Sequence, residues 1–429
     1  MENKRKFVVA VIVIGVVFSL ADLNKAEVIH LKVSGAKVDC VDVPVHTVID
    51  LSESLANVPV EDIAVSFEQT TRRDLVQVTG KRIPGQIVKG GDNKAEMWWV
   101  VPRIQAGSTD GWIARLKQKE KRGDDILSWK DFSWKDTEGQ YLDLLFDGRR
   151  VTRYMYAYDT STPQRIFETY KPLHHVFDAQ GKHLLTNGPD GEHKYTKKIK
   201  YPHHRGIFIG WNRLEFGGQR FDLWHMSGVG QVHQKFLEKE AGPVLARSSS
   251  LINWNDKGGE AMIAERRQVT VFGQSKPAVL LLDFRSELKA VRGDVFLNGD
   301  PEHAGMQYRA HNDVATGGKD VKATYLFHKD GIDAHKDRDL PWAAMSYGLN
   351  GRRYSVLHMN HPDNPKETLY SAYRDYGRFG AFFKKKIGAG ETLTLRYRIL
   401  VIEGEMPTRG ELAKKYSEFV DGPKVEVEK

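Results

Sequence analysis

Short segments in which apolar and polar residues alternate recur along most of this chain. Leu282 and Phe284, for example, have one parity, and Asp283 and Arg285 have the other. Because successive side chains of a strand point to opposite faces, this alternation predicts strands with one buried face. The 3.6-residue period of a helix is weak, and we expect only one helix, over residues 408–419. The fold class predicted is therefore mainly β, with antiparallel sheets.

A chain of 429 residues is long enough for two or three domains. Short strands separated by turn residues over 27–131 predict a small N-terminal β-sandwich. From Trp134 onward the strands become longer, and we expect residues 135–429 to form a large antiparallel β-sandwich that ends in a short helix. The charged segment 118–125 predicts an exposed linker. In the first unit, the expected strands are 27–33, 45–51, 63–67, 76–78 and 97–101.

Residues 1–21 have the pattern of a signal peptide. A basic start at 4–6 precedes an apolar run at 7–18, and small residues (Ser19, Ala21) follow at the cleavage positions. The run is short for a membrane span, although an uncleaved anchor is the alternative. We therefore expect a periplasmic or secreted bacterial protein, without integral membrane association once the signal is removed. The single cysteine, Cys40, excludes an intrachain disulfide.

The charge of the chain excludes one class of partner. The formal net charge is +8, from 64 basic and 56 acidic residues, and the basic residues are scattered. Without a basic arm or stripe, we expect no nucleic-acid partner. A mildly basic surface favours an acidic polysaccharide, although a small imbalance on a solvated surface is the simpler interpretation. The oligomeric state does not follow from the sequence.

The stretch 201–212 and its continuation 221–233 concentrate histidines, tryptophans, an arginine and an asparagine. Within it, 207–211 reads as a strand, with Ile207 and Ile209 on one face and Phe208 on the other. Imidazoles beside a guanidinium and aromatic rings suit an oxygen-rich substrate. The alternative is that each histidine is hydrogen-bonded within the fold for structural reasons.

Later segments carry further polar residues that one strand face can present. Gln307, Arg309 and His311 share a parity, and Glu265 stands in another strand. The candidate catalytic residues are His204, Arg205, His233, Glu265, Arg309 and His311. The candidate substrate-binding residues are His203, Trp211, Trp224, His225, Asn312, His361, Arg374 and Tyr376. For the tryptophans, a place in the core is the alternative.

A divalent metal bound by histidines is a cofactor that the sequence leaves open. The side chains that would serve as ligands are His203, His204, His225, His233, His303, His311 and Glu265. Their spacing follows neither His-x-His nor His-Glu-x-x-His, and a lone cysteine rules out a cysteine-based site. No cofactor is therefore certain.

Four motifs resemble a known family. They are Tyr-Pro-His-His-Arg-Gly (201–206), Glu-His-Ala-Gly-Met-Gln-Tyr-Arg-Ala (302–310), Met-Asn-His-Pro-Asp-Asn-Pro (359–365) and Tyr-Arg-Asp-Tyr-Gly-Arg-Phe-Gly (373–380). Over roughly residues 135–405 the chain resembles the bacterial exported "PmoA family" proteins, whose domain is also called DUF6807. The methane monooxygenase subunit behind that label has several spanning helices, and this chain has no apolar run of that length after its signal. The resemblance implies a supersandwich like that of galactose mutarotases, and work on carbohydrates.

Together these patterns predict an exported carbohydrate-active protein, with a polysaccharide or oligosaccharide as its partner. The first hypothesis is a glycan-cleaving enzyme of the glycoside hydrolase or polysaccharide lyase type. In it, Arg205 and Arg309 bind the substrate, His204, His233 or His311 moves the proton, and Glu265 serves as acid/base or metal ligand. A non-catalytic glycan-binding protein and a metal-dependent oxidoreductase are the alternatives.

Overall fold

The computed structural model describes residues 27–52, 55–70, 81–90, 94–119, 129–196 and 198–428. The expected signal peptide, the expected strand 76–78 and most of the expected linker lie outside these ranges. Within them, no helix combines the length and the apolarity needed to cross a membrane.

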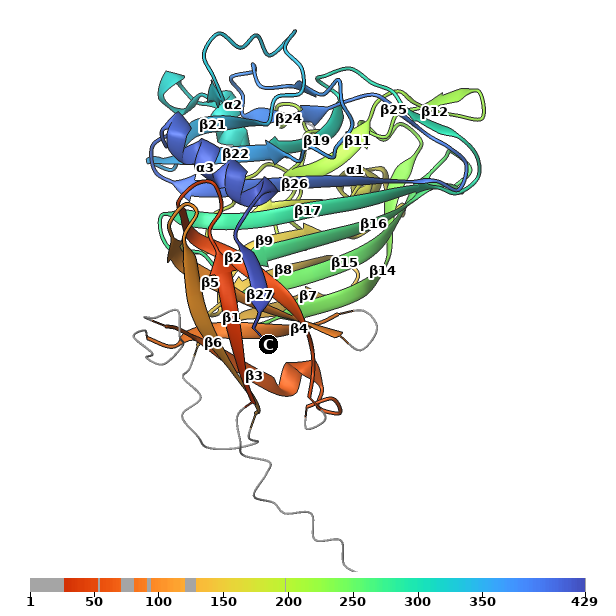
Figure 1. The fold of residues 1–429 in the computed structure, drawn as a ribbon. Helices are drawn as coiled ribbons and strands as arrows, with labels where there is room; N and C mark the ends of the chain where they lie inside the picture. Colours follow the sequence, from red (N-terminus) through yellow and green to blue (C-terminus); the bar gives the residue numbers. More distant parts are fainter. Residues whose placement is uncertain are drawn as a thin grey trace, which may run out of the picture.

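The first unit is a seven-stranded sheet that curls around its own core (Figure 1). Its strands, in spatial order, are β2 (Cys40–Asp50), β5 (Lys94–Ile104), β4 (Ile83–Lys89), β3 (Ile63–Gln69), β6 (Thr109–Gln118), β1 (Glu27–Ser34) and β27 (Lys424–Val427), and the 3-10 helix η1 (Val60–Asp62) precedes β3. β2 lies against β27, so the two ends of the sheet meet around buried Phe67, Trp99 and Trp112. The expected strands within the described ranges are confirmed. That the end of the chain returns to pair with β1 was not foreseen.

Two eight-stranded antiparallel sheets make up most of the remaining chain. The first large sheet contains, in spatial order, β23 (Leu369–Tyr370), β24 (Arg378–Phe382), β19 (Ala304–Arg309), β11 (Ile207–Trp211), β10 (Leu173–Val176), β9 (Arg149–Met155), β8 (Tyr141–Phe146) and β7 (Phe132–Thr137). The second large sheet contains β14 (Gly230–Ala241), β15 (Leu245–Asn255), β16 (Ala261–Phe272), β17 (Ala278–Ala290), β26 (Thr392–Glu403), β22 (Arg352–Asn360), β21 (Trp342–Leu349) and β20 (Thr324–Phe327). A small sheet joins β13 (Gln219–Phe221), β12 (Leu214–Phe216), β18 (Val295–Leu297) and β25 (Lys385–Ile387).

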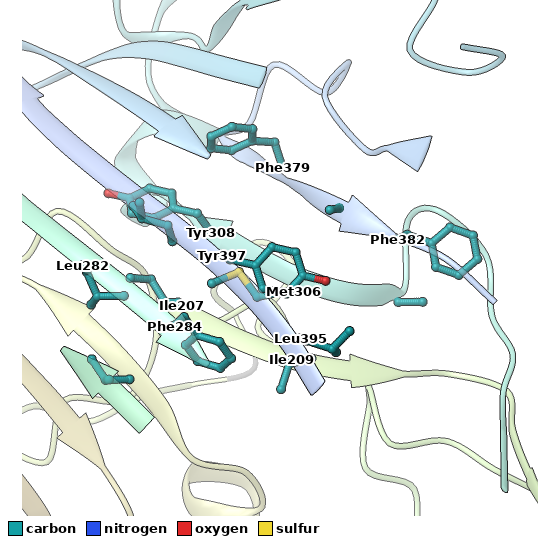
Figure 2. Packing of buried hydrophobic residues seen from close by; sticks show 14 of the residues in the cluster. Ile207, Ile209, Leu282, Phe284, Met306, Tyr308, Phe379, Phe382, Leu395 and Tyr397 are labelled. Atoms are coloured by element: carbon teal, nitrogen blue, oxygen red, sulfur yellow. The ribbon is translucent and has the colours of Figure 1, made fainter. Parts of the chain in front are cut away.

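The hydrophobic core lies between the two large sheets, as alternating side chains require. Ile207 and Ile209 of β11 point into it and belong to the same buried cluster as Leu282 and Phe284 of β17 (Figure 2). Phe208, of the opposite parity, belongs to a separate cluster on the outer face of the first large sheet. The predicted fold class, mainly β with a large antiparallel β-sandwich, is confirmed, whereas the first unit, which we expected to be a small β-sandwich, is a single sheet whose two ends meet.

The N-terminal unit and the last helix cover the second large sheet on its far side. The side-chain oxygen of Gln86 accepts hydrogen bonds from the backbone of Val244 (3.1 Å) and Leu245 (2.9 Å). Val88 packs with residues of the second large sheet and of the helix α3 (Arg409–Val420) in one apolar cluster. These contacts place the N-terminal unit on the face of the second large sheet that points away from the core.

Helix α3 confirms the single predicted helix. Thr408 caps it, and Glu411 completes a capping box, which satisfies free N–H groups of the first turn. Two shorter helices, α1 (Pro163–Thr169) and α2 (Asn312–Thr316), and the 3-10 helix η2 (Lys319–Val321) were not predicted. Because β19 ends at Arg309, His311 caps α2 instead of extending the strand.

Candidate functional site

Four loops meet over the outer face of the first large sheet. They are residues 201–206 before β11, 222–229 before β14, 298–303 before β19 and 371–377 before β24. The loops lie close to the strands because the sheet has glycines beneath them: a Cβ at Gly210 would lie 2.2 Å from the carbonyl oxygen of Leu223. Phe208 of β11 and Gln307 of β19 are neighbours on this face. Segments far apart in the sequence are thus held together on a rigid sheet.

Three histidines from three of these loops form the centre of the site, which we call the histidine cluster: His203, His225 and His303. One ring nitrogen of each lies within 4.8 Å of the corresponding nitrogens of the others. The ring centroid of His203 is 4.4 Å from that of His225 and 5.9 Å from that of His303. This spacing suits three ligands of one divalent ion.

Two of the three rings are oriented by carboxylates. His225 Nδ1 lies 2.9 Å from an Asp222 oxygen, and His303 Nδ1 lies 2.9 Å from an Asp300 oxygen. Burial alone would raise the pKa of Asp222, but hydrogen bonds from His225 outweigh it and hold the pKa below its usual value. A charged carboxylate at Nδ1 fixes the ring and leaves Nε2 as the nitrogen that faces a metal, which is the common arrangement around protein metal ions.

The third ring, His203, is held neutral. Burial, followed by the neighbouring His225 and Lys171, lowers the pKa of His203 to about 2. Within the described part of the chain, its Nε2 atom has no hydrogen-bond partner. A neutral imidazole with a free lone pair is the form that binds metals.

His204 lies beneath the histidine cluster and is almost fully buried. Its ring is 4.2 Å from that of His203 and stacks on Tyr376 with an interplanar angle of 6°. Trp224 packs edge-on against the other side, at 5.7 Å. Neither ring nitrogen of His204 has a partner among the residues that the structure describes. A buried imidazole without a partner is rare in a protein interior and marks a place where a ligand is expected.

Arg205 follows His204 in sequence but serves a different purpose. Its guanidinium donates to the carbonyl oxygens of Pro202 (2.9 Å), Glu168 (3.1 Å) and Phe167 (2.6 Å). It also lies 4.0 Å above the ring of Tyr170. These contacts anchor the loop that carries His203 and His204, so Arg205 positions the site and is not presented to a substrate.

Arg309, Arg374 and Tyr376 border the site. Arg309 is buried on the outer face and donates to the carbonyl oxygen of Tyr376. Arg374 is about half exposed and forms an ion pair with Glu302, the residue before His303. The structure therefore brings these three predicted residues next to the histidine cluster.

Glu265 and His233 lie elsewhere. Glu265 is on β16 in the second large sheet, and its oxygens accept from Arg267 (2.9 and 2.8 Å), Trp254 (2.8 Å) and Ser286 (2.8 Å). With four donors, this carboxylate is saturated. It shares its strand face with residues of the main core, so the first large sheet separates it from His204. His233 Nδ1 lies 3.3 Å from the Tyr154 hydroxyl.

The remaining predicted residues have structural contacts. Trp211 is in the core and donates to the carbonyl oxygen of Phe383 (3.1 Å). Asn312 accepts from the backbone of Lys200, and His311 Nδ1 accepts from the backbone of Asp313 at the start of α2. His361 packs against Phe419 of α3, with ring centroids 5.3 Å apart.

Sequence reasoning missed the carboxylates of the site and one of its cations. Asp222 and Asp300 each precede their histidine by three positions, and Asp190 has the same relation to His193, with 2.7 Å between the paired atoms. A recurring Asp-x-x-His spacing was therefore the available signal. Lys171 was missed because it does not stand in the histidine-rich stretch.

Comparisons with known proteins show the family of the chain and leave its activity open. A family model described as "Family of unknown function (DUF6807)" matches residues 141–417. No curated protein matches the chain. A solved structure described as "Crystal Structure of Heparinase III" is similar to it at 13% identity with a TM-score of 0.30, over 67% of this chain and 38% of that one. A likeness this weak carries no argument about function, and the chain spans little more than a third of that protein.

Proposed function

Since the chain belongs to the DUF6807 family, whose function is unknown, we propose a function from its own site: a metal-dependent enzyme that acts on a carbohydrate. His203, His225 and His303 bind the divalent ion, and His204 contacts the substrate beside it. Cleavage of a glycan, by hydrolysis or by elimination, is the reaction we propose. The substrate is a polysaccharide or oligosaccharide met outside the cytoplasm.

The observation that carries this proposal is the histidine cluster with its two oriented rings. Three imidazoles come from loops far apart in the chain, and two of them receive a carboxylate at Nδ1. A purely structural role would not require three ring nitrogens to face one another. Three protein ligands leave a coordination position for water or substrate, as in catalytic rather than structural metal sites.

A metal in this position supplies a Lewis acid and an activated water. The chain's own contribution is the neutral imidazole of His204. Burial first, and then the charge of Arg378, hold the pKa of His204 well below its usual value. A ring with such a pKa is a poor base, so His204 donates an N–H to a substrate oxygen on which negative charge develops. This role replaces the proton transfer that we expected from the sequence.

A carbohydrate suits the opening of the site. His225 and His303 are partly exposed, with side chains 37% and 30% accessible, and Tyr201 beside His204 is 39% exposed. Polar imidazoles next to the face of an aromatic ring match the alternating hydroxyl and C–H faces of a sugar. The expected export of the chain also supports this proposal, because the proposed substrate is met outside the cytoplasm.

The test is a screen of purified protein against plant and marine polysaccharides, with and without a chelator. New reducing or unsaturated ends are measured by mass spectrometry. We expect turnover that a chelator abolishes and a divalent metal restores. His225→Ala should lose it and His183→Ala, at an exposed histidine outside the cluster, should keep it. Binding of a sugar without new ends would favour a glycan-binding protein, and turnover that is indifferent to the chelator would refute the metal.

The donor set also supports a second candidate, a metal-dependent oxidoreductase. Three imidazoles accept copper or iron as readily as zinc. Oxidised sugar products that appear only with an electron acceptor would favour this candidate. Activity with zinc, which has no redox chemistry, would exclude it.

A further inference from the structure

Among the described residues, no carboxylate forms an ion pair with three buried arginines and a buried lysine that lie next to the histidine cluster. They are Lys171, Arg205, Arg309 and Arg378. The other fully buried arginines are different: Arg153 pairs with Asp143 at 2.6 Å, and Arg267 pairs with Glu265 at 2.8 Å. Charges are normally buried in proteins only with a partner of opposite sign. The four side chains therefore form an exception that is confined to one place, which we call the cation group.

Neutral oxygens receive the hydrogen bonds of the cation group. Lys171 Nζ donates to the carbonyl oxygens of His203 (2.8 Å) and Trp224 (2.7 Å). The bonds of Arg205 and Arg309 go to carbonyl oxygens as well. These bonds satisfy most donors, but they leave the positive charge uncompensated.

Arg378 makes three hydrogen bonds to neutral groups and keeps one donor free. It donates to the Tyr376 hydroxyl (3.2 Å), the Gln307 side-chain oxygen (3.3 Å) and the Ser371 hydroxyl (2.5 Å). Arg378 Nη2 and Arg309 Nε have no hydrogen-bond partner within the described ranges. The two arginines are paired across β19 and β24 on the outer face of the first large sheet.

Arg309 differs in the direction of its pKa shift from a buried arginine that has carboxylate partners. Burial lowers the pKa of Arg309 to about 10. Arg153 shows the opposite, because the hydrogen bonds that it donates to Asp143 and Glu192 outweigh burial and raise its pKa. The carboxylates around the histidine cluster form their ion pairs with other groups: Asp222 with His225, Asp300 with His303, and Glu302 with Arg374.

We propose that the substrate of this site is an acidic glycan, whose carboxylate or sulfate group supplies the negative charge that the cation group lacks. This inference rests on the proposed function and narrows its substrate class. The acidic group binds at the opening lined by His225 and His303, close to the bound metal. Lys171, Arg309 and Arg378 act on it through the protein interior, where charges are screened less than in water.

The inference is tested by calorimetric titration of metal-loaded protein with matched sugars. Oligogalacturonate is compared with the same oligomer after methyl esterification, which removes the charge and keeps the sugar. A sulfated galactan oligomer is compared with its desulfated form, so that the two sources of negative charge are distinguished. Inorganic sulfate serves as the probe without a sugar.

We expect the acidic member of one pair to bind at least roughly tenfold more tightly than its neutral match, with an advantage that shrinks as salt rises. Arg378→Gln should remove most of this advantage, and Arg378→Lys should retain part of it. Because Arg378 is buried, Lys171→Met provides a second variant, and circular dichroism and metal content check that each variant is folded.

Equal affinity for charged and neutral sugars in metal-loaded protein would overturn the inference and leave the metal site standing. Binding of inorganic sulfate as tight as that of the acidic sugar would also overturn it, because the anion alone would then be recognised. If the protein binds no metal, the proposed function itself is refuted.

Discussion

His203 and His303 lie one hundred positions apart in the chain, yet their ring centroids are 5.9 Å from each other. The two loops that carry them meet only when β11 and β19 are paired in the first large sheet. Metal binding is therefore coupled to folding. An ion that binds only the folded state of the chain stabilises that state by about 2.7 kcal/mol when the free ion concentration is a hundred times its Kd.

The first prediction follows from this coupling. Adding Zn²⁺ to metal-free protein should raise the melting temperature, and His225→Ala should abolish the rise without a large loss of stability in the absence of metal. Differential scanning fluorimetry with increasing Zn²⁺ measures both. An equal rise in wild type and His225→Ala would show that the ion binds elsewhere.

The second prediction concerns the carboxylates behind the histidine cluster. Asp300→Asn keeps the size of the side chain but removes the charge that orients His303, so metal affinity should fall by about 10–100-fold. Asp190→Asn is the matched control, because Asp190 bonds the exposed His193 in the same Asp-x-x-His arrangement. Competition with a coloured chelator gives the affinities. A loss in the control that equals the loss in Asp300→Asn would move the site to His193.

The third prediction concerns stability in acid. Burial lowers the pKa of His175 from 6.5 to about 4. Between these values the unfolded chain takes up a proton on this ring and the folded chain does not, so the free energy of unfolding decreases as the pH falls. This one ring accounts for about 3 kcal/mol across the window. His175→Gln should be less stable near neutrality and should lose less stability on acidification, as measured by urea unfolding. Parallel curves for variant and wild type would contradict the assignment.

The fourth prediction concerns Glu265, the buried carboxylate that lies outside the site. Glu265→Gln leaves Arg267 buried without its partner, so the chain should lose about 3–5 kcal/mol of stability. Metal stoichiometry should stay unchanged, because Glu265 lies on the other side of the first large sheet. A variant that folds but no longer binds metal would place Glu265 in the site after all.

The sequence predicts the strands whose two faces differ. The expected strand 97–101 lies within β5, and the expected helix 408–419 nearly coincides with α3, because both have one buried face. β21 was missed since it is buried on both faces and shows no alternation. In β15 three consecutive serines are buried, which hides the period of two. Apolar and polar residues alternate only in a strand that has one buried face. β21 and the first half of β15 are buried on both faces, so their sequences show no alternation.

The candidate site was predicted in part, for a similar reason. Histidines and aromatic rings in 201–233 drew attention to His203, His204, Trp224 and His225, and the structure brings these four together. Parity placed Arg309 on the same strand face as Gln307, and in β19 the two residues do share a face. Glu265 was grouped with it because a sequence does not reveal which sheet, or which side of a sheet, a strand occupies. Pairing between β11, β19 and β24 decides that, and it is a long-range property.

The central claim is that His203, His225 and His303 bind a single divalent ion. Crystals soaked in Zn²⁺ and measured at the zinc absorption edge test it most directly. The account predicts an anomalous peak between the three imidazoles, about 2.0–2.1 Å from one nitrogen of each ring. A strong peak at Asp190, Glu192 and His193 with none at the histidine cluster would contradict it.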